Sequence, residues 1–266
     1  MMTSPSRSSA ESCPFATSSE PTSKRVGSFV PSAIDRETVV SALGALVSQP
    51  NYPCIAALKS IYKKDFQIGI YGEFGSGQSW SALRQDLLRF VELQKQSKSI
   101  YLTYFAVFQP QTFSEESFET ALWNELSNLT STEEMLEDWA DPSHADPSDK
   151  NFRFSLGGTE FFVVGLHTNS SRLARKFPYP MMIFNVFAQF EALEKLGQYE
   201  SMIQTNRSRD IKFQGQVNPM VEQHGDNWEP IQFSGKSNSK EWKCPFHFLL
   251  KKDKVKKTGN HSSEMF

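Results

Sequence analysis

The most constraining feature of this 266-residue chain is a pair of β-prone runs joined by two glycines. The runs are Phe152 to Leu156 and Thr159 to Leu166, with Gly157-Gly158 between them. Glycine readily adopts the positive φ angles of a two-residue hairpin turn, so this segment predicts a β-hairpin. The second run, TEFFVVGL, is nearly all apolar, which predicts an interior strand covered on both faces.

A histidine and a group of cations follow the second run directly. His167 lies at the strand's end, and Arg172, Arg175 and Lys176 come next. Cations placed there suit the acidic groups of a ligand whose centre His167 holds. The alternative is a structural histidine followed by a solvated basic turn, and the residues alone leave both interpretations open.

The rest of the chain alternates between helical and strand patterns. Helices are expected over residues 36–47, 53–62, 80–95, 114–126, 132–139 and 189–196, with Asp35, Ser79 and Ser114 as N-caps. Strands are expected over residues 66–74, 100–108 and 180–186. The segment 203–214 is expected to continue as helix, with Arg207, Arg209 and Asp210 as surface charges. This order predicts a single α+β domain with a mixed β-sheet, a central β-hairpin and flanking helices.

Both ends of the chain differ in composition from the middle. Residues 1–33 are rich in Ser, Thr and Pro, which predicts a disordered tail. Residues 251–266 form a charged tail. The folded, ligand-binding domain is therefore expected over residues 34–250.

Composition excludes several classes of protein. The net charge is −2 and the basic residues are scattered, so no nucleic-acid groove is expected. No apolar run reaches the length of a membrane span and no secretory signal is visible, which predicts a soluble, cytoplasmic protein. The cysteines Cys13, Cys54 and Cys244 are odd in number and form no CxxC pair, which argues against a disulfide framework and a structural zinc site.

The loop DPSHADPSD, residues 141–149, collects turn-forming and titratable residues ahead of the hairpin. Its His144, Asp146 and Asp149 can bind a metal, contact a cationic substrate or simply cap turns. Gly75-Ser76-Gly77 precedes a helix, but neither phosphate-loop pattern is present there.

Seven segments together resemble the YqcI/YcgG family in order and spacing, over roughly residues 35 to 248. They are YPC at 52–54, DPSHADPSD with FRFSLGGTEFFVVGLH within 141–167, SRLARKFPYP at 171–180, FNVFAQFEAL at 184–193, NPM at 218–220, QFSGK at 232–236 and WKCPF at 242–246. Members of that family include haem-dependent N-oxygenases, among them the arginine N-hydroxylase of D-cycloserine biosynthesis and the pre-guanitoxin N-hydroxylase.

The resemblance implies a haem b (iron) monooxygenase, an oxidoreductase that N-hydroxylates the guanidine of arginine or an arginine-derived molecule in secondary metabolite biosynthesis. Its partners would be that guanidine substrate, O2 and an external electron donor or reductase. His167 matches the family's GLH histidine and is the expected iron ligand, with Arg172 and Arg175 at the haem propionates. We expect Asp146 and Asp149, rather than Glu160, to bind the guanidinium.

Further residues matching the family's segments have less definite roles. Asn185 and Gln189 are expected near the site as amide donors or acceptors. Asn218 and Cys244 also match family motifs, without an assigned role. His224, His247 and Cys244 are the alternative iron ligands.

The chain departs from the family pattern at three positions. Tyr52 stands in place of the phenylalanine of FPC, Thr168 where proline is usual, and Phe187 in place of a histidine. The last departure leaves open a haem-binding sensor or carrier without oxygenase turnover. A non-haem metal hydrolase that uses His144, Asp146, Asp149 and His224 is a third hypothesis.

Overall fold

The computed structural model describes residues 34–130, 138–220, 229–239 and 241–248. Within these residues one five-stranded sheet has the order β1-β2-β5-β4-β3. Its strands are β1 (Phe66–Tyr71), β2 (Thr103–Phe108), β3 (Phe154–Leu156), β4 (Thr159–Leu166) and β5 (Met181–Val186). The β1–β2 pair is parallel and the other pairs are antiparallel. The predicted α+β class with a mixed sheet is confirmed.

The predicted hairpin forms at Gly157-Gly158. Both glycines have positive φ, 59° and 64°, and Leu156 pairs with Thr159 across the turn. The first strand begins at Phe154, two residues later than the sequence pattern indicates. The hairpin lies at one end of the strand order, with β3 at the edge and β4 in the interior.

The helices are α1 (Arg36–Val47), α2 (Ile55–Lys63), α3 (Trp80–Gln96), α4 (Glu115–Asn128), α6 (Phe187–Lys195) and α7 (Tyr199–Gln214). Asp35 caps α1 by accepting the Thr38 amide at 2.7 Å, and Ser114 caps α4 through a capping box. Ser79 precedes α3 but does not cap it, because its hydroxyl accepts the Gly72 amide instead.

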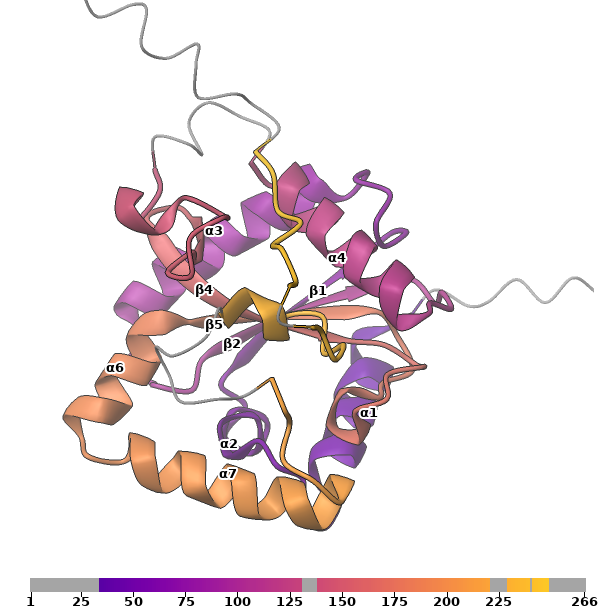
Figure 1. Cartoon of the computed structure of the whole chain (residues 1–266), viewed down its shortest axis with the longest axis vertical. Coiled ribbons are helices and arrows are strands. Elements are labelled where there is room, and N and C mark those ends of the chain that lie inside the picture. The colour runs from indigo at the N-terminus through magenta and orange to yellow at the C-terminus, as the bar shows by residue number, and fades with distance from the viewer. Residues whose placement is uncertain (1–33, 131–137, 221–228, 240, 249–266) are drawn as a thin grey trace, which may run out of the picture. The chain divides into compact units, whose positions relative to one another are not determined.

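The helices cover the two faces of the sheet in separate groups. Helices α3 and α4 lie on one face, and α1, α2 and α7 lie on the other (Figure 1). Side chains alternate along β4, so Phe161 and Val163 face α3 and α4. Val164 and Leu166 belong to the opposite core.

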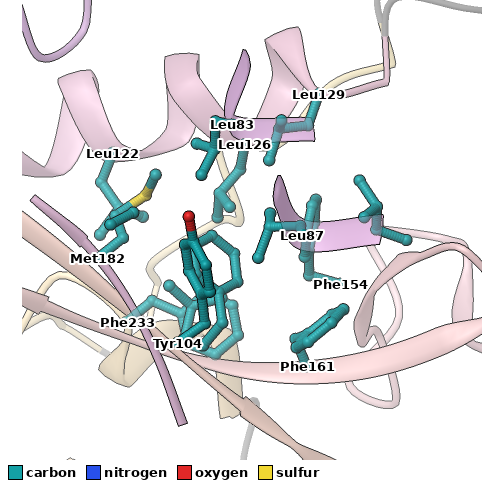
Figure 2. Packing of buried hydrophobic residues seen from close by; sticks show 14 of the residues in the cluster. Leu83, Leu87, Tyr104, Leu122, Leu126, Leu129, Phe154, Phe161, Met182 and Phe233 are labelled. Atoms are coloured by element: carbon teal, nitrogen blue, oxygen red, sulfur yellow. The ribbon is translucent and has the colours of Figure 1, made fainter. Parts of the chain in front are cut away.

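The face under α3 and α4 is filled by large apolar side chains. Leucines of both helices interdigitate with Tyr104, Phe161 and Met182 of the strands (Figure 2). Phe118 and Trp123 of α4 are 0% and 1% exposed. This packed face supplies much of the hydrophobic stabilisation of the fold.

The C-terminal segment, residues 229–239 and 241–248, packs against the face under α3 and α4. It joins β4 where the Gly165 amide donates to the Phe233 carbonyl at 2.7 Å. Glu119 of α4 then accepts hydrogen bonds from four of its residues, Ser234, Lys236, Asn238 and Trp242. Phe246 of the WKCPF motif packs on Trp139 and Phe152. This motif therefore has a structural role in the aromatic core.

Some expectations fall outside the described residues. The tails at 1–33 and 251–266 lie there, as does most of the helix expected at 132–139. Among the helices that the structure describes, none combines the length and apolar character needed to cross a membrane.

Candidate functional site

A cavity of about 320 Å³ opens on the sheet face covered by α1, α2 and α7. Its volume is at the lower end of the range for small-molecule sites, about 300–1,000 Å³. The sheet contributes an apolar floor that includes Phe105, Val164 and Ile183, and α2 contributes Ala56 and Ala57. A small organic molecule with an apolar body suits this lining.

One stripe of α7 forms the opposite wall. Met202, Ile203, Asn206, Arg207 and Asp210 all line the cavity, and they lie on one side of the helix because positions three or four residues apart share a face. Because an α-helix rises 1.5 Å per residue, Glu200 and Asp210 mark positions roughly 15 Å apart along this wall. The wall is thus apolar in part and polar towards the C-terminal end of the helix.

A buried ion pair lies at that polar end. Arg172 Nη2 is 2.6 Å from both carboxylate oxygens of Asp210, and the side chains are 8% and 10% exposed. The main-chain N–H of Asn218 also donates to Asp210 Oδ2, at 2.8 Å. Arg172 Nη1 is buried and has no hydrogen-bond partner within the described part of the chain. One donor of a buried guanidinium is therefore left over.

Arg175 also lines the cavity, but main-chain carbonyls occupy its guanidinium. Nη1 donates to the carbonyls of Gly165 and Phe233, and Nη2 donates to that of Gln232, each at 3.1 Å. Burial lowers the pKa of Arg175 to about 10. Arg175 ties η2 (Leu173–Arg175) to β4 and η3 (Glu229–Gln232).

The YPC segment closes the cavity between α2 and α7. The Tyr52 carbonyl accepts from Arg209 Nε at 2.7 Å, and the Ile55 amide donates to Asn206 at 3.0 Å. Cys54 lines the cavity at the N-terminus of α2, where its sulfur accepts the Ala57 amide. Burial raises the pKa of the Cys54 thiol, so the thiol is protonated at neutral pH.

Asn185 and Gln189 both line the cavity. Gln189 Nε2 donates to the Leu102 carbonyl at 2.6 Å. Asn185 accepts from the Thr103 hydroxyl at 3.3 Å and donates to the Phe162 carbonyl at 3.4 Å. These bonds hold both amides in place at the cavity wall.

His167 lies on the other face of the sheet. It follows Leu166, a cavity residue, and its side chain points the opposite way. The imidazole is 1% exposed and stacks on Phe118 of α4, with ring centroids 4.3 Å apart. Burial lowers the pKa of His167, and Nδ1 finds no hydrogen-bond partner among the residues that the structure describes.

This placement separates residues that the sequence analysis assigned to one site. Arg172 and Arg175 line the cavity, whereas the His167 ring belongs to the packed face. Asp210 already accepts from Arg172 Nη2, and main-chain carbonyls already accept from the guanidinium of Arg175. The described residues therefore do not fit a haem held by His167 with its propionates on Arg172 and Arg175.

The expected guanidinium ligands lie elsewhere. Asp146 and Asp149 are exposed, and each caps a turn: Asp146 accepts from Ser148 and Asp149 from Asn151, at 2.8 Å. Neither lines the cavity. This geometry corresponds to the turn-capping alternative.

The third acidic candidate is also engaged. Glu160 accepts from Arg153 at 2.8 Å and pairs with His144 at 2.6 Å. The described residues, which do not include His224, contain no group of three His, Cys, Asp or Glu side chains that could hold a metal ion. The metal hydrolase hypothesis thus gains no support from them.

Of the alternative iron ligands, His224 lies outside the described residues, and Cys244 and His247 lie away from the cavity. Cys244 packs against the aromatic core, and burial raises its pKa to about 12. His247 Nδ1 lies 3.4 Å from the Ser127 hydroxyl of α4. Phe187, at the position of the family histidine, is buried under the Arg153 guanidinium.

Sequence reasoning missed the role of α7. Asp210 was expected to be a surface charge, but it is 7% exposed and anchors Arg172. The available signal was the spacing of Asn206 and Asp210, which continues the stripe begun by Met202 and Ile203.

Comparison with known proteins gives one match. The model of the YqcI/YcgG family matches residues 43–247. No curated protein and no solved structure matches the chain. The matched range contains every cavity-lining residue named above.

Proposed function

The chain belongs to the YqcI/YcgG family, and we propose that it binds a small organic molecule in the cavity between the sheet and α7. One observation carries this proposal. Segments that resemble the family are far apart in the sequence, yet they contribute Cys54, Arg172, Asn185, Asn218 and Gln232 to one cavity. Packing of an ordinary core does not require so many polar side chains in one place.

The lining also has the character of a ligand site. The sheet side is mostly apolar, with Thr103 and Asn185 as its polar side chains, and further polar groups gather along α7 and the segments beside it. Ligand sites typically combine apolar walls with a few fixed polar groups that orient the ligand. Gln189 and Asn185 are held by main-chain hydrogen bonds, which keeps them oriented before a ligand arrives.

A substitution that fills the cavity tests this proposal. Ala57→Phe places a ring in the cavity, whereas Ala82→Phe adds the same ring to the exposed surface of α3. The probes are hexanoate, 3-phenylpropionate and L-arginine, each measured by melting temperature and by titration calorimetry. We expect at least one probe to bind the unmodified chain and the Ala82→Phe variant, with binding lost in Ala57→Phe. Equal binding by both variants, or no binding by any chain, contradicts the proposal.

The more specific proposal is haem-dependent N-hydroxylation of a guanidine, which the family resemblance supports. A guanidinium in this cavity has Glu200 and Glu229 as lining carboxylates, in place of Asp146 and Asp149. His167 stays the iron ligand that the resemblance implies, and its buried Nδ1 has no partner in the described structure, although its ring lies outside the cavity. An iron held there requires Phe118 to move off the ring.

Absorption spectroscopy tests the haem proposal. The chain is supplemented with haem and measured oxidised, reduced and with carbon monoxide, before and after adding L-arginine. A stoichiometric Soret band that shifts with arginine and disappears in His167→Ala supports an N-hydroxylase with His167 on the iron. Haem retention without arginine-dependent oxygen consumption supports the carrier or sensor instead. A colourless protein overturns both.

A further inference from the structure

We infer that the ligand of this cavity carries a carboxylate, and that Arg172 binds it through Nη1. The inference rests on the proposed function, because it takes the cavity to be the ligand site. The inference adds to that proposal the chemical class of the ligand and the side chain that binds its carboxylate.

The geometry of Arg172 leaves one donor group available. Asp210 receives both of its short contacts from Nη2, 2.6 Å to each oxygen. Nη1 lies in the same buried guanidinium, and no partner for it exists among the described ranges. A buried donor left without an acceptor is costly, especially on a charged group. An acceptor supplied by the ligand removes this penalty.

Local charge favours an anionic acceptor over a neutral one. At this end of the cavity Arg172, Arg175 and Asp210 form a group of two cations and one anion, and Asp210 is fully engaged by Arg172 and Asn218. The other charged residues of the lining, Glu200, Arg207 and Glu229, act on Tyr199 at the N-terminal end of α7. The carbonyls around Arg175 carry no net charge. A carboxylate would balance this excess and bind a guanidinium by charge-assisted hydrogen bonds.

A second arginine of the cavity lining, Arg207, also supports a ligand with acceptor oxygens. Arg207 lies one turn before Asp210 on α7 and lines the cavity. Its Nε is also buried without an acceptor in the part of the chain described. Each of these two guanidinium groups in the cavity lining has one nitrogen without an acceptor, which indicates a ligand with acceptor oxygens.

The position of Arg172 also orients the ligand. Arg172 and Asp210 lie towards the C-terminal end of α7, whereas Glu200 lies in its first turn. The sheet floor between these ends is mostly apolar. We therefore expect a carboxylic acid with a methylene or apolar body, its carboxylate at Arg172 and its other end towards Glu200.

Matched acids and amides test the inference on the unmodified chain. The pairs are hexanoate and hexanamide, 3-phenylpropionate and 3-phenylpropionamide, and L-arginine and L-argininamide. We expect at least one acid to bind about tenfold more tightly than its amide, the effect of a hydrogen bond to a charged group. Equal affinities within every pair overturn the inference, because Nη1 then has no preference for an anion.

A paired variant assigns the preference to Arg172. Arg172→Met combined with Asp210→Leu removes both charges together, so neither is left alone in the interior. In this variant the acid should lose its advantage over the matched amide, so the ratio of the two affinities should fall to about one. An undiminished advantage overturns the role of Arg172.

The two proposals fail in different ways. If Ala57→Phe abolishes binding but acids and amides bind alike, the cavity is the ligand site and the carboxylate inference is wrong. If binding survives Ala57→Phe, the cavity is not the ligand site and both proposals fall.

Discussion

The two faces of the sheet differ in packing: one is a close-packed core, and the other contains a cavity. Under α3 and α4 the side chains are large, aromatic and close-packed, and Glu119 satisfies four donors of the C-terminal segment. Under α7 the face is hollow, and a buried guanidinium keeps an unpartnered donor within the described structure. A close-packed face serves stability, whereas a hollow face lined by a charged group with an unpartnered donor indicates a ligand.

Adjacent residues of β4 show the contrast at closest range. Val163 is fully buried among the side chains of the packed face, and Val164 is half-buried at the cavity floor. The same holds at the strand's end, where Leu166 lines the cavity and His167 stacks on Phe118. Alternation along the strand thus divides structural from ligand-facing positions.

The largest effect should come from truncating an aromatic of the packed face. Phe118→Ala removes ring contacts with Phe74, Phe113 and His167, and should lower the free energy of unfolding by about 3–5 kcal/mol. Urea unfolding measures the loss. Phe190→Ala, at the cavity, is the matched control and should cost less. Equal losses would mean that the two faces are packed alike.

Breaking the buried ion pair should come next. Arg172→Met leaves Asp210 as a lone buried carboxylate and should destabilise the chain by about 3 kcal/mol. Adding Asp210→Leu should restore most of that stability, as measured by the same urea titration. A double variant no more stable than the single one contradicts a direct coupling between the two charges.

The neighbouring valines offer the sharpest test of the comparison. Val163→Ala leaves a void in a close-packed core and should cost about 2 kcal/mol. Val164→Ala only enlarges an existing cavity and should cost about 1 kcal/mol. Thermal unfolding of both variants checks the difference. A larger loss at Val164 would reverse the assignment of the two faces.

The smallest effect concerns a buried carboxylate on the packed side. Glu125 Oε1 accepts the amides of Gly75 and Gly77, at 2.9 and 3.2 Å, so this glycine loop binds a carboxylate of the chain itself. Burial raises the pKa of Glu125 above its usual 4.5. The folded chain therefore holds the proton more tightly than the unfolded chain, and stability falls as pH rises above about 4.5.

Glu125→Gln removes this ionisation and keeps an amide oxygen for the loop. The melting temperature of the variant relative to the unmodified chain should therefore increase with pH, over the range above about 4.5. Melting curves recorded from pH 4 to pH 8 measure the trend. A constant difference across that range contradicts the buried, proton-binding carboxylate.

Sequence alone determined the local structure. Gly157-Gly158 fixed the hairpin because both positions need positive φ, and Asp35 and Ser114 fixed helix starts because their side chains accept local amides. The apolar run of β4 predicted an interior strand, which the sheet order confirms. These features depend on residues a few positions apart, so neighbouring residues suffice to specify them.

Only the tertiary structure decided which residues share a site. His167 and Arg172 are five residues apart but lie on opposite sides of the sheet, whereas Arg172 and Asp210 are paired across 38 positions. Strand alternation shows that neighbouring side chains separate, but what covers each face depends on how α4 and α7 dock. That docking buries apolar area over long sequence distances, so no local pattern in the chain records it.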